Sequence, residues 1–306
     1  MRKFILKRLG YAVLSLFLLS FTIFFFVRVT GDPTTLLVEP GASREDIAAL
    51  QQQLGLDRPV WVQYGSFVSS LARGDFGRSF YYRTPVVELY LSRLPNSLLL
   101  AVAAMTFSLL IGIPSGILAA VRLNGVWDRG GKIFALLGLS MPQFWVGLLL
   151  ILFFSVYLGW LPSSGSGTPL HVLMPAFALG WYFAAAHMRL TRSSMLEVLG
   201  SEYIKLARLK GLPEALVIGK HAFKNALIPV LTLAGINLVL MINIAVVVET
   251  VFAWPGVGRL LYEGIAFRDF PVVQATIVLG GAMIIVVNLV VDVLYAWIDP
   301  RIRLGR

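Results

Sequence analysis

The chain has 306 residues, of which 58% are hydrophobic and only 14% are charged, and its mean hydropathy is +0.80. Soluble domains carry about 45–50% apolar and about 25% charged residues. A soluble fold of this length could not bury so much apolar surface, whereas a lipid bilayer accommodates it. The absence of cysteine excludes disulfides and thiolate metal sites. Composition therefore predicts a polytopic membrane protein.

Long runs without charged residues predict an all-α fold with six transmembrane helices. The first run, Leu9 to Val27, is longer than the apolar region of a signal peptide, about 7–15 residues, and predicts a retained helix. A charge-free stretch from Ile133 to Met188 is too long for one span and breaks at the Pro-, Gly- and Ser-rich residues 160–169. The other spans are expected near 94–121, 133–159, 171–190, 225–248 and 270–298.

Basic residues gather in alternate loops, which predicts the orientation of the spans. Residues 1–8, 122–132, 189–225 and 299–306 together carry 17 Lys/Arg against 5 Asp/Glu, whereas 30–97 and 252–272 carry 8 against 9. By the positive-inside rule, the N and C termini are both expected in the cytoplasm. The same distribution accounts for the net charge of +10 without nucleic-acid binding.

These boundaries divide the chain into an N-terminal tail with the first helix, an outer segment, a membrane core and a short C-terminal tail. The outer segment is expected to contain a helix that Ser43 caps and Gly55 ends. The core contains a cytoplasmic loop at 190–225. The four parts are 1–29, 30–97, 98–300 and 301–306.

The cytoplasmic loop is the most informative segment. Ile204, Ala207 and Leu212 alternate with basic residues, Gly211 is a helix stop, and Pro213 follows it. This pattern predicts a short helix, a glycine stop and a second amphipathic helix that continues into the fifth span. Such an element either docks in a groove on a cytoplasmic partner or is a basic loop that only fixes topology.

This loop resembles the Glu-Ala-Ala loop of bacterial ABC importer permeases, in the dipeptide, oligopeptide and nickel branch. The triplet aligns with 205–207, so only Ala207 of it survives, but Gly211 is kept and Pro229 follows at the interval of the peptide branch. The resemblance runs from about residue 1 to 303. It is also carried by the segments 31–33, 54–59, 74–79, 140–145, 158–162, 249–258, 268–274 and 299–303.

The resemblance implies a type I ABC importer permease fold in the bacterial inner membrane. It also implies a second homologous permease, two ATPase subunits or domains that hold ATP and Mg, and an extracytoplasmic solute-binding protein. This chain itself would need no cofactor. Its loop would couple ATP-driven closure of the ATPases to alternating access, through Glu202, Tyr203, Ala207, Lys210, Gly211 and Leu212.

Polar residues within or beside the spans are candidates to line the pathway. Gln143 follows Pro142, which should kink the third span either for the pathway or for packing. Asn237 and Asn243 either line the pathway or bond a neighbouring helix. Glu249 either meets substrate or binding protein, or pairs with Arg259 or Arg268. Asn288 and Asp292 share one face of the sixth span, where Asp292 either acts in transport or pairs with a cytoplasmic-side arginine.

No enzymatic site is evident in the sequence. A phosphate-binding GxxxxGK[ST] loop is absent, and no nucleophile–base or carboxylate pair stands out. The three histidines have no metal-ligand spacing. An intramembrane enzyme and an ion-driven secondary transporter remain as rivals; the latter predicts internal repeats, which are not visible. The resemblance implies di- or oligopeptides as the cargo, with nickel or metallophore complexes, glutathione and opines as alternatives.

Overall fold

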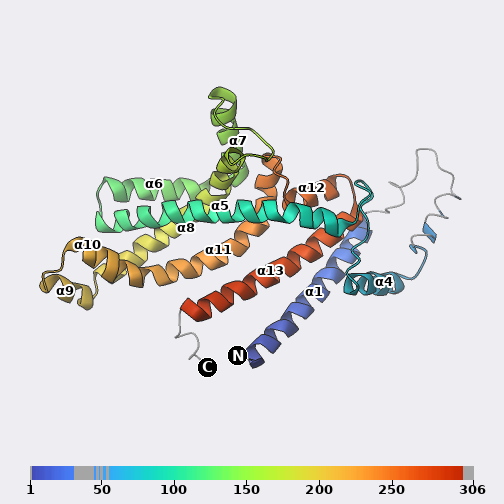
Figure 1. The fold of residues 1–306 in the computed structure, drawn as a ribbon, viewed down its shortest axis with the longest axis horizontal. Coiled ribbons are helices and arrows are strands. Elements are labelled where there is room, and N and C mark those ends of the chain that lie inside the picture. The colour runs from blue at the N-terminus through green and yellow to red at the C-terminus, as the bar shows by residue number, and fades with distance from the viewer. Residues whose placement is uncertain (1, 31–44, 46–47, 49–50, 53–54, 299–306) are drawn as a thin grey trace. The chain divides into compact units, whose positions relative to one another are not determined.

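The structure, a computed structural model, describes residues 2–30, 45, 48, 51–52 and 55–298. In these ranges the chain forms helices and loops, with one antiparallel bridge between Arg78 and Pro85 (Figure 1). Lipid offers no partners to backbone N–H and C=O groups, so long apolar runs satisfy them internally as helices. The all-α prediction is confirmed. The helix expected between Ser43 and Gly55, and the tail at 301–306, lie largely or wholly outside the described residues.

Four described helices are long and apolar enough to cross a membrane. They are α1 (Arg2–Thr30), α5 (Val86–Val121), the run from Glu214 that contains α11 (Phe223–Val251), and α13 (Phe270–Ile298). The bent pair α6 (Val126–Ser140) and α7 (Gln143–Leu150), extended by the π-helix Ile151–Tyr157, gives a fifth span if counted as one.

Helix α8 (Leu170–Leu199) is long enough to span but does not pass the same test of hydropathy. His171 and His187 lie among its hydrophobic residues and lower its hydropathy. It also continues past Leu190, where the sequence predicted the span to end, to Leu199. The six-span count therefore stays a prediction, which depends on α8 and on whether the bent pair α6–α7 crosses as one span.

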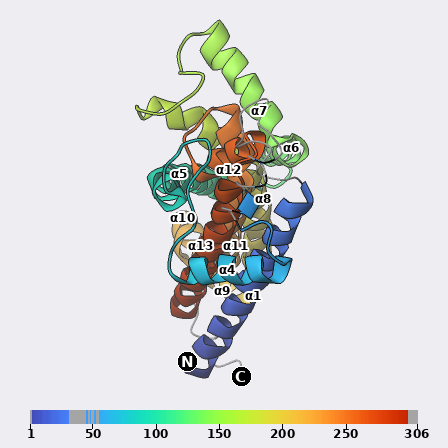
Figure 2. The same ribbon diagram turned by 90° about the vertical axis from the view of Figure 1, so that its right-hand side faces the viewer.

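The chain packs as two compact units. The first joins residues 1–95 with 256–287 and contains α1, α4 (Val60–Ala72), the start of α5, α12 (Val257–Ala266) and most of α13. Figure 2 shows α4 lying across α1, where the rings of Phe24 and Tyr64 pack edge to face at 5.2 Å and Arg28 donates to Gln63. Its buried cores include Val86, Leu260, Val272 and Ala275.

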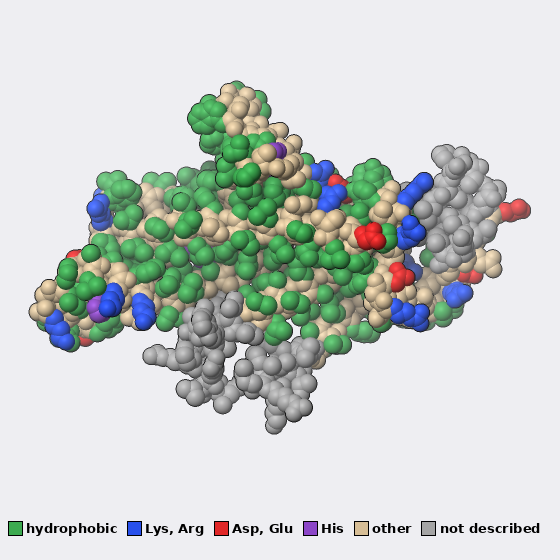
Figure 3. Space-filling model, in the orientation of Figure 1, with side chains coloured by type: hydrophobic (Ala, Val, Ile, Leu, Met, Phe, Trp, Pro, Cys, Tyr) green, Lys and Arg blue, Asp and Glu red, His purple; other side chains and the backbone are tan. Residues whose placement is uncertain are grey.

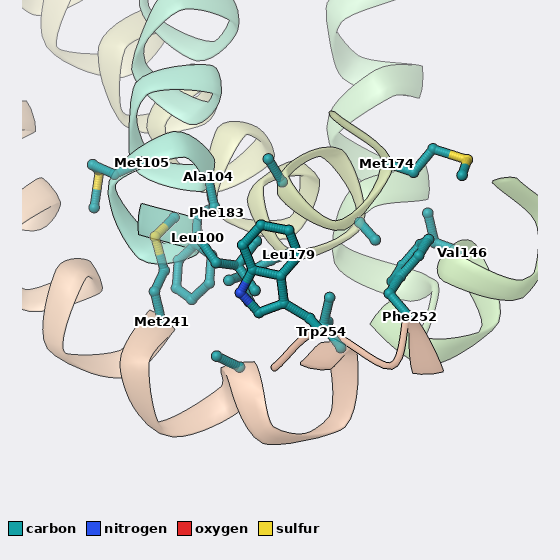
Figure 4. Close-up of a cluster of buried hydrophobic side chains, with 14 of the residues drawn as sticks. Leu100, Ala104, Met105, Val146, Met174, Leu179, Phe183, Met241, Phe252 and Trp254 are labelled. Carbon is teal, nitrogen blue, oxygen red and sulfur yellow. The ribbon is translucent and has the colours of Figure 1, made fainter. Parts of the chain in front are cut away.

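The second unit joins residues 96–255 with 288–306. Its core is built by α5, α7, α8 and α11 (Figure 4). Trp254, from the loop after α11, lies beside Leu179 and Phe183, and Phe252 points toward Val146. The core thus ties the outer end of α11 to the helices before it.

Small residues let α5 and α8 approach closely within this second unit. A Cβ added at Gly112 would lie 2.7 Å from the carbonyl oxygen of Ala184, and one at Gly116 would lie 2.6 Å from that of Met188. Glycines at i and i+4 are a common contact surface in membrane helices, because they allow backbones to touch. Side chains larger than hydrogen have no room at this seam.

The third predicted span is broken rather than gently kinked. α6 ends at Ser140, Met141 and Pro142 are extended, and α7 begins at Gln143 after a bend of 107°. Proline has no N–H to continue the ladder and disfavours helical geometry at the preceding residue. Figure 1 shows α7 turning away from α6 at this point.

Candidate functional site

The candidate site is the helical loop between α8 and α11. Helix α9 (Glu202–Leu209) buries Ile204 and Ala207, one turn apart, against Met195, Val217 and other small apolar residues. The predicted short amphipathic helix is thus present. Burial on one side only holds α9 against its own chain and leaves its other side outward.

The outward side of α9 is apolar as well as charged. Tyr203, Leu206 and Leu209 are 45%, 53% and 84% exposed. Lys205 and Lys210 are exposed beside them, and Figure 3 shows basic and hydrophobic side chains together where α9 and α10 lie. Of these three apolar residues, only Tyr203 was predicted from the sequence to belong to the site. Leu206 and Leu209 could have been found in the sequence, because hydrophobic residues fall on both faces of this short helix.

Gly211 ends α9 in the left-handed conformation, with φ of +75°. Its N–H donates to the carbonyl of Arg208 at 2.9 Å, and the N–H of Leu212 reaches that of Ala207 at 3.4 Å. These two bonds form the Schellman motif, in which a glycine just past the helix satisfies the last free carbonyls. The predicted glycine stop is present, and it turns the chain into α10 (Glu214–Leu216).

Polar contacts fix the rest of the loop. Arg208 and Glu214 form an ion pair across the turn at 2.7 Å, and Asn225 Nδ2 donates to the hydroxyl of Tyr203 at 3.0 Å. Between α10 and α11 the chain forms a π-helix at Val217–Ala222. π-helical turns inside longer helices are frequent at functional positions. The second predicted amphipathic helix therefore exists, with this irregular turn inside it.

Asn237, a pathway candidate, is buried in a polar bridge between three helices of the second unit. Its Nδ2 lies 3.2 Å from Nε2 of His187, whose Nδ1 lies 2.7 Å from the Oγ of Ser108. The residues come from α11, α8 and α5 respectively. This arrangement favours bonding between helices for Asn237. The sequence left His187 without a role, although a histidine inside an apolar run signals a buried polar partner.

Glu249, another candidate, is fully buried near the end of α11. It accepts a hydrogen bond from the Oγ of Ser97 at 2.6 Å. Next to Ser97, Asn96 donates to the carbonyl of Pro255 and accepts from the indole N–H of Trp254, each at 3.0 Å. Asn96 and Ser97 of α5 are thus hydrogen-bonded to the end of α11 and to the loop that follows it.

The remaining pathway candidates are more exposed or less constrained. Gln143 is half-buried, and its Oε1 is buried without a hydrogen-bond partner among the described residues. Asn243 is exposed and donates to the carbonyl of Val239, whereas Asn288 is simply exposed. Asp292 lies in α13, but its side chain is outside the description. Of the described contacts, none joins these four residues.

The first unit contains a cluster of polar contacts that could not be predicted from the sequence. Asp269 accepts hydrogen bonds from the hydroxyl of Ser79 and the N–H of Tyr81, and Tyr81 stacks on Phe267 at 4.1 Å. Tyr82 donates to Glu263 at 2.7 Å. Burial, with the Glu263 carboxylate next in importance, raises the pKa of Tyr82 to about 12. Two of the resemblance segments, 74–79 and 268–274, meet here.

A metal site has no support in the described part of the chain. Within it, no group of three or more His, Asp or Glu residues is placed to hold an ion. The arrangement instead offers an exposed apolar and basic face on α9 and polar residues among packed helices.

The chain is similar to known membrane components of transport systems. The family model described as "Binding-protein-dependent transport system inner membrane component" matches residues 112–304, and a model for the N-terminal part of such components matches residues 1–101. The glutathione transport system permease protein GsiC of Escherichia coli K12 is 42% identical over 304 residues, 99% of each chain. The protein of the same name in Salmonella typhi has the same identity and coverage.

Solved structures share the fold at low sequence identity. The membrane chain of the inward-facing MetNI methionine ABC transporter has a TM-score of 0.59 at 19% identity, covering 70% of this chain and 97% of that one. A chain of an amino acid ABC transporter with histidines has a TM-score of 0.55 at 16% identity, covering 68% of this chain and 94% of that one. At such identities the likeness concerns the fold alone.

Proposed function

We propose that this chain, which belongs to the family of binding-protein-dependent transport system inner membrane components, moves short peptides through the inner membrane. Family membership makes it a permease subunit of an ABC importer. The match over nearly the whole chain is the observation that carries the proposal. We further propose a cargo, a set of partners and roles for individual residues.

The loop geometry supports a coupling role for α9. An element that transmits movement needs firm attachment on one side and a surface for the moving partner on the other. Burial of Ile204 and Ala207 supplies the attachment, and exposed Tyr203, Leu206 and Leu209 supply the surface. We assign Glu202, Tyr203, Ala207, Lys210, Gly211 and Leu212 to coupling with an ATPase that holds ATP and Mg. Coupling requires that α9 bind the two ATPase states with different affinity.

The remaining partners follow from the same proposal. A second homologous permease would complete the pathway, and a solute-binding protein would deliver cargo to the outer segment 30–97. Both termini would lie in the cytoplasm. Gln143, Asn243, Asn288 and Asp292 remain candidates to line the pathway, whereas the buried contacts of Asn237 and Glu249 support structural roles.

For the cargo, glutathione is the first compound to test, because relatives of this similarity carry it in their names. Glutathione is itself a tripeptide, so this choice lies within the class of short peptides. Nickel or metallophore complexes and opines are the other candidates.

The test is uptake of labelled glutathione and of a labelled dipeptide, in cells with and without the gene. Unlabelled glutathione, dipeptide, longer peptides and nickel serve as competitors. We expect gene-dependent uptake that peptides block and nickel does not. No gene-dependent uptake of either peptide, or uptake that nickel blocks and peptides do not, would overturn the peptide cargo and leave the family assignment standing.

A further inference from the structure

A groove with basic and apolar walls lies between α6 and α8 in the second unit. Its volume is about 510 Å³, and Lys132 from α6 with Arg189, Arg192 and Ser193 from α8 form its polar lining. A second hollow of about 370 Å³ shares Leu139, Arg189 and Ser193 with it, which makes the two continuous. One long groove therefore has a basic part and an apolar part.

The basic part carries more positive charge than its own chain neutralises. Asp128, fully buried at the start of α6, accepts from Lys132 Nζ at 2.9 Å and from Arg192 Nε at 2.7 Å. The side chain of Arg189 is exposed and has no hydrogen bond or ion pair with any described residue. Three cations thus face one carboxylate, and of the described residues that line the groove none is acidic. The uncompensated charge calls for an anion.

The arrangement of residues along the groove indicates which kind of anion would fit it. α6 and α8 run antiparallel, with Gly131 against Met188 and Gly138 against Ala185. Lys132 and Arg192 lie toward the end where the loop at 122–125 begins α6. Leu136, Leu139 and Ala186 follow in the opposite direction, away from that loop. A ligand must therefore carry a negative group at one end and an apolar chain at the other.

We propose that this groove binds an anionic phospholipid. The phosphate lies between Lys132 and Arg189, which donate charge-assisted hydrogen bonds to its oxygens, and Ser193 offers a hydroxyl. An acyl chain follows Leu136, Leu139 and Ala186. Basic pockets between membrane helices on the cytoplasmic side suit anionic headgroups for this reason. Neutral phosphatidylcholine would leave the excess positive charge uncompensated.

The test is native mass spectrometry of the full chain in nanodiscs that contain phosphatidylcholine and phosphatidylglycerol. Arg189→Gln and Lys132→Gln each remove one charge from the lining, and Arg129→Gln, an exposed α6 position outside it, is the matched control. We expect retention of one phosphatidylglycerol to weaken about fivefold per removed charge and to be unchanged in the control. The side chain of Arg189 makes no hydrogen bond or ion pair to lose, and Asp128 keeps Arg192 when Lys132 is replaced, so both variants should fold.

Four outcomes would overturn the proposal. Equal retention of phosphatidylglycerol in all variants would contradict a role for the basic residues. Equal retention of phosphatidylcholine and phosphatidylglycerol would contradict selectivity for an anionic lipid. Displacement by inorganic phosphate alone indicates a site for the free anion. Loss of the lipid on assembly with partner subunits indicates that an acidic protein segment fills the groove instead.

Discussion

At the scale of single residues, the end of α9 depends on a backbone conformation that most side chains disfavour. Gly211 has φ of +75°, and a Cβ added there would meet no described atom within 4 Å. The left-handed conformation costs roughly 1–2 kcal/mol for an ordinary L-residue, whereas asparagine tolerates it better. A substitution at Gly211 therefore acts through strain and through whatever docks on the loop.

We expect Gly211→Arg to abolish transport while leaving membrane insertion intact. The arginine has room within the chain, but it strains the turn and places a bulky charge beside the proposed ATPase surface. Gly211→Asn is the matched variant and should retain most uptake. Membrane levels by immunoblot and uptake of the transported peptide measure the two effects separately. Normal uptake by a correctly assembled Gly211→Arg transporter would remove the coupling role.

The same residue shows which turns can be read from the sequence. Gly211 is predictable because a glycine followed by proline is a local signature of a helix end. Ala253 and Arg268 occupy the equivalent position after α11 and α12, with φ of 47° and 52°. Neither residue is a glycine, so the sequence gives no sign of the turn. The surrounding structure holds both residues in the left-handed conformation instead. Their turns could not be predicted from residue type.

At the scale of helices, the seam between α5 and α8 depends on the absence of side chains. Gly112 and Gly116 face backbone atoms of α8, so a methyl group at either position must push the helices apart. Gly130, by contrast, lies within α6 with no described atom within 4 Å of an added Cβ. Gly116, which is tightly packed, and Gly130, which has open space around it, can therefore be compared by the same substitution.

We expect Gly116→Ala to destabilise the chain by about 1–3 kcal/mol, the range for overpacking. Gly130→Ala should be neutral or stabilise by up to about 1 kcal/mol, since alanine favours the helix. Thermal unfolding of the purified variants in detergent measures both. Equal unfolding temperatures for the two variants would contradict the close contact at Gly116.

Contacts between elements were harder to predict than the elements themselves. The apolar runs predicted α1, α5, α8, α11 and α13, because their signal is contained within each run. Asp269 and Ser79 are 190 positions apart, and no local pattern brings them together. Likewise, Ser108, His187 and Asn237 meet only once three helices have packed. Pro142 signalled a disturbance in its span, but tertiary packing sets the 107° bend.

At the scale of the whole molecule, the side on which each loop lies depends on α8. If α8 crosses the bilayer, the loop at 160–169 and the coupling loop lie on opposite sides. If it does not, both lie on one side. The six-span arrangement and the cytoplasmic location of both termini depend on the first alternative.

We expect single cysteines at Ser164 and Lys210 to label from opposite sides. The chain has no native cysteine, so there is no background labelling. Both positions are exposed, so the reagent can reach the introduced thiols. A membrane-impermeant maleimide should label Ser164→Cys in intact spheroplasts. It should label Lys210→Cys only after the membrane is opened. Labelling of both variants in intact spheroplasts would contradict a transmembrane α8.

The outward face of α9 has a consequence for the life of the protein in the cell. Tyr203, Leu206 and Leu209 place apolar side chains in the aqueous phase whenever no partner covers them. Chaperones and membrane proteases recognise such surfaces on orphan subunits. Occupancy of this face would then report whether assembly is complete, and the amount of permease would follow the supply of its partner. The helix proposed to transmit force would also limit the chain's own abundance.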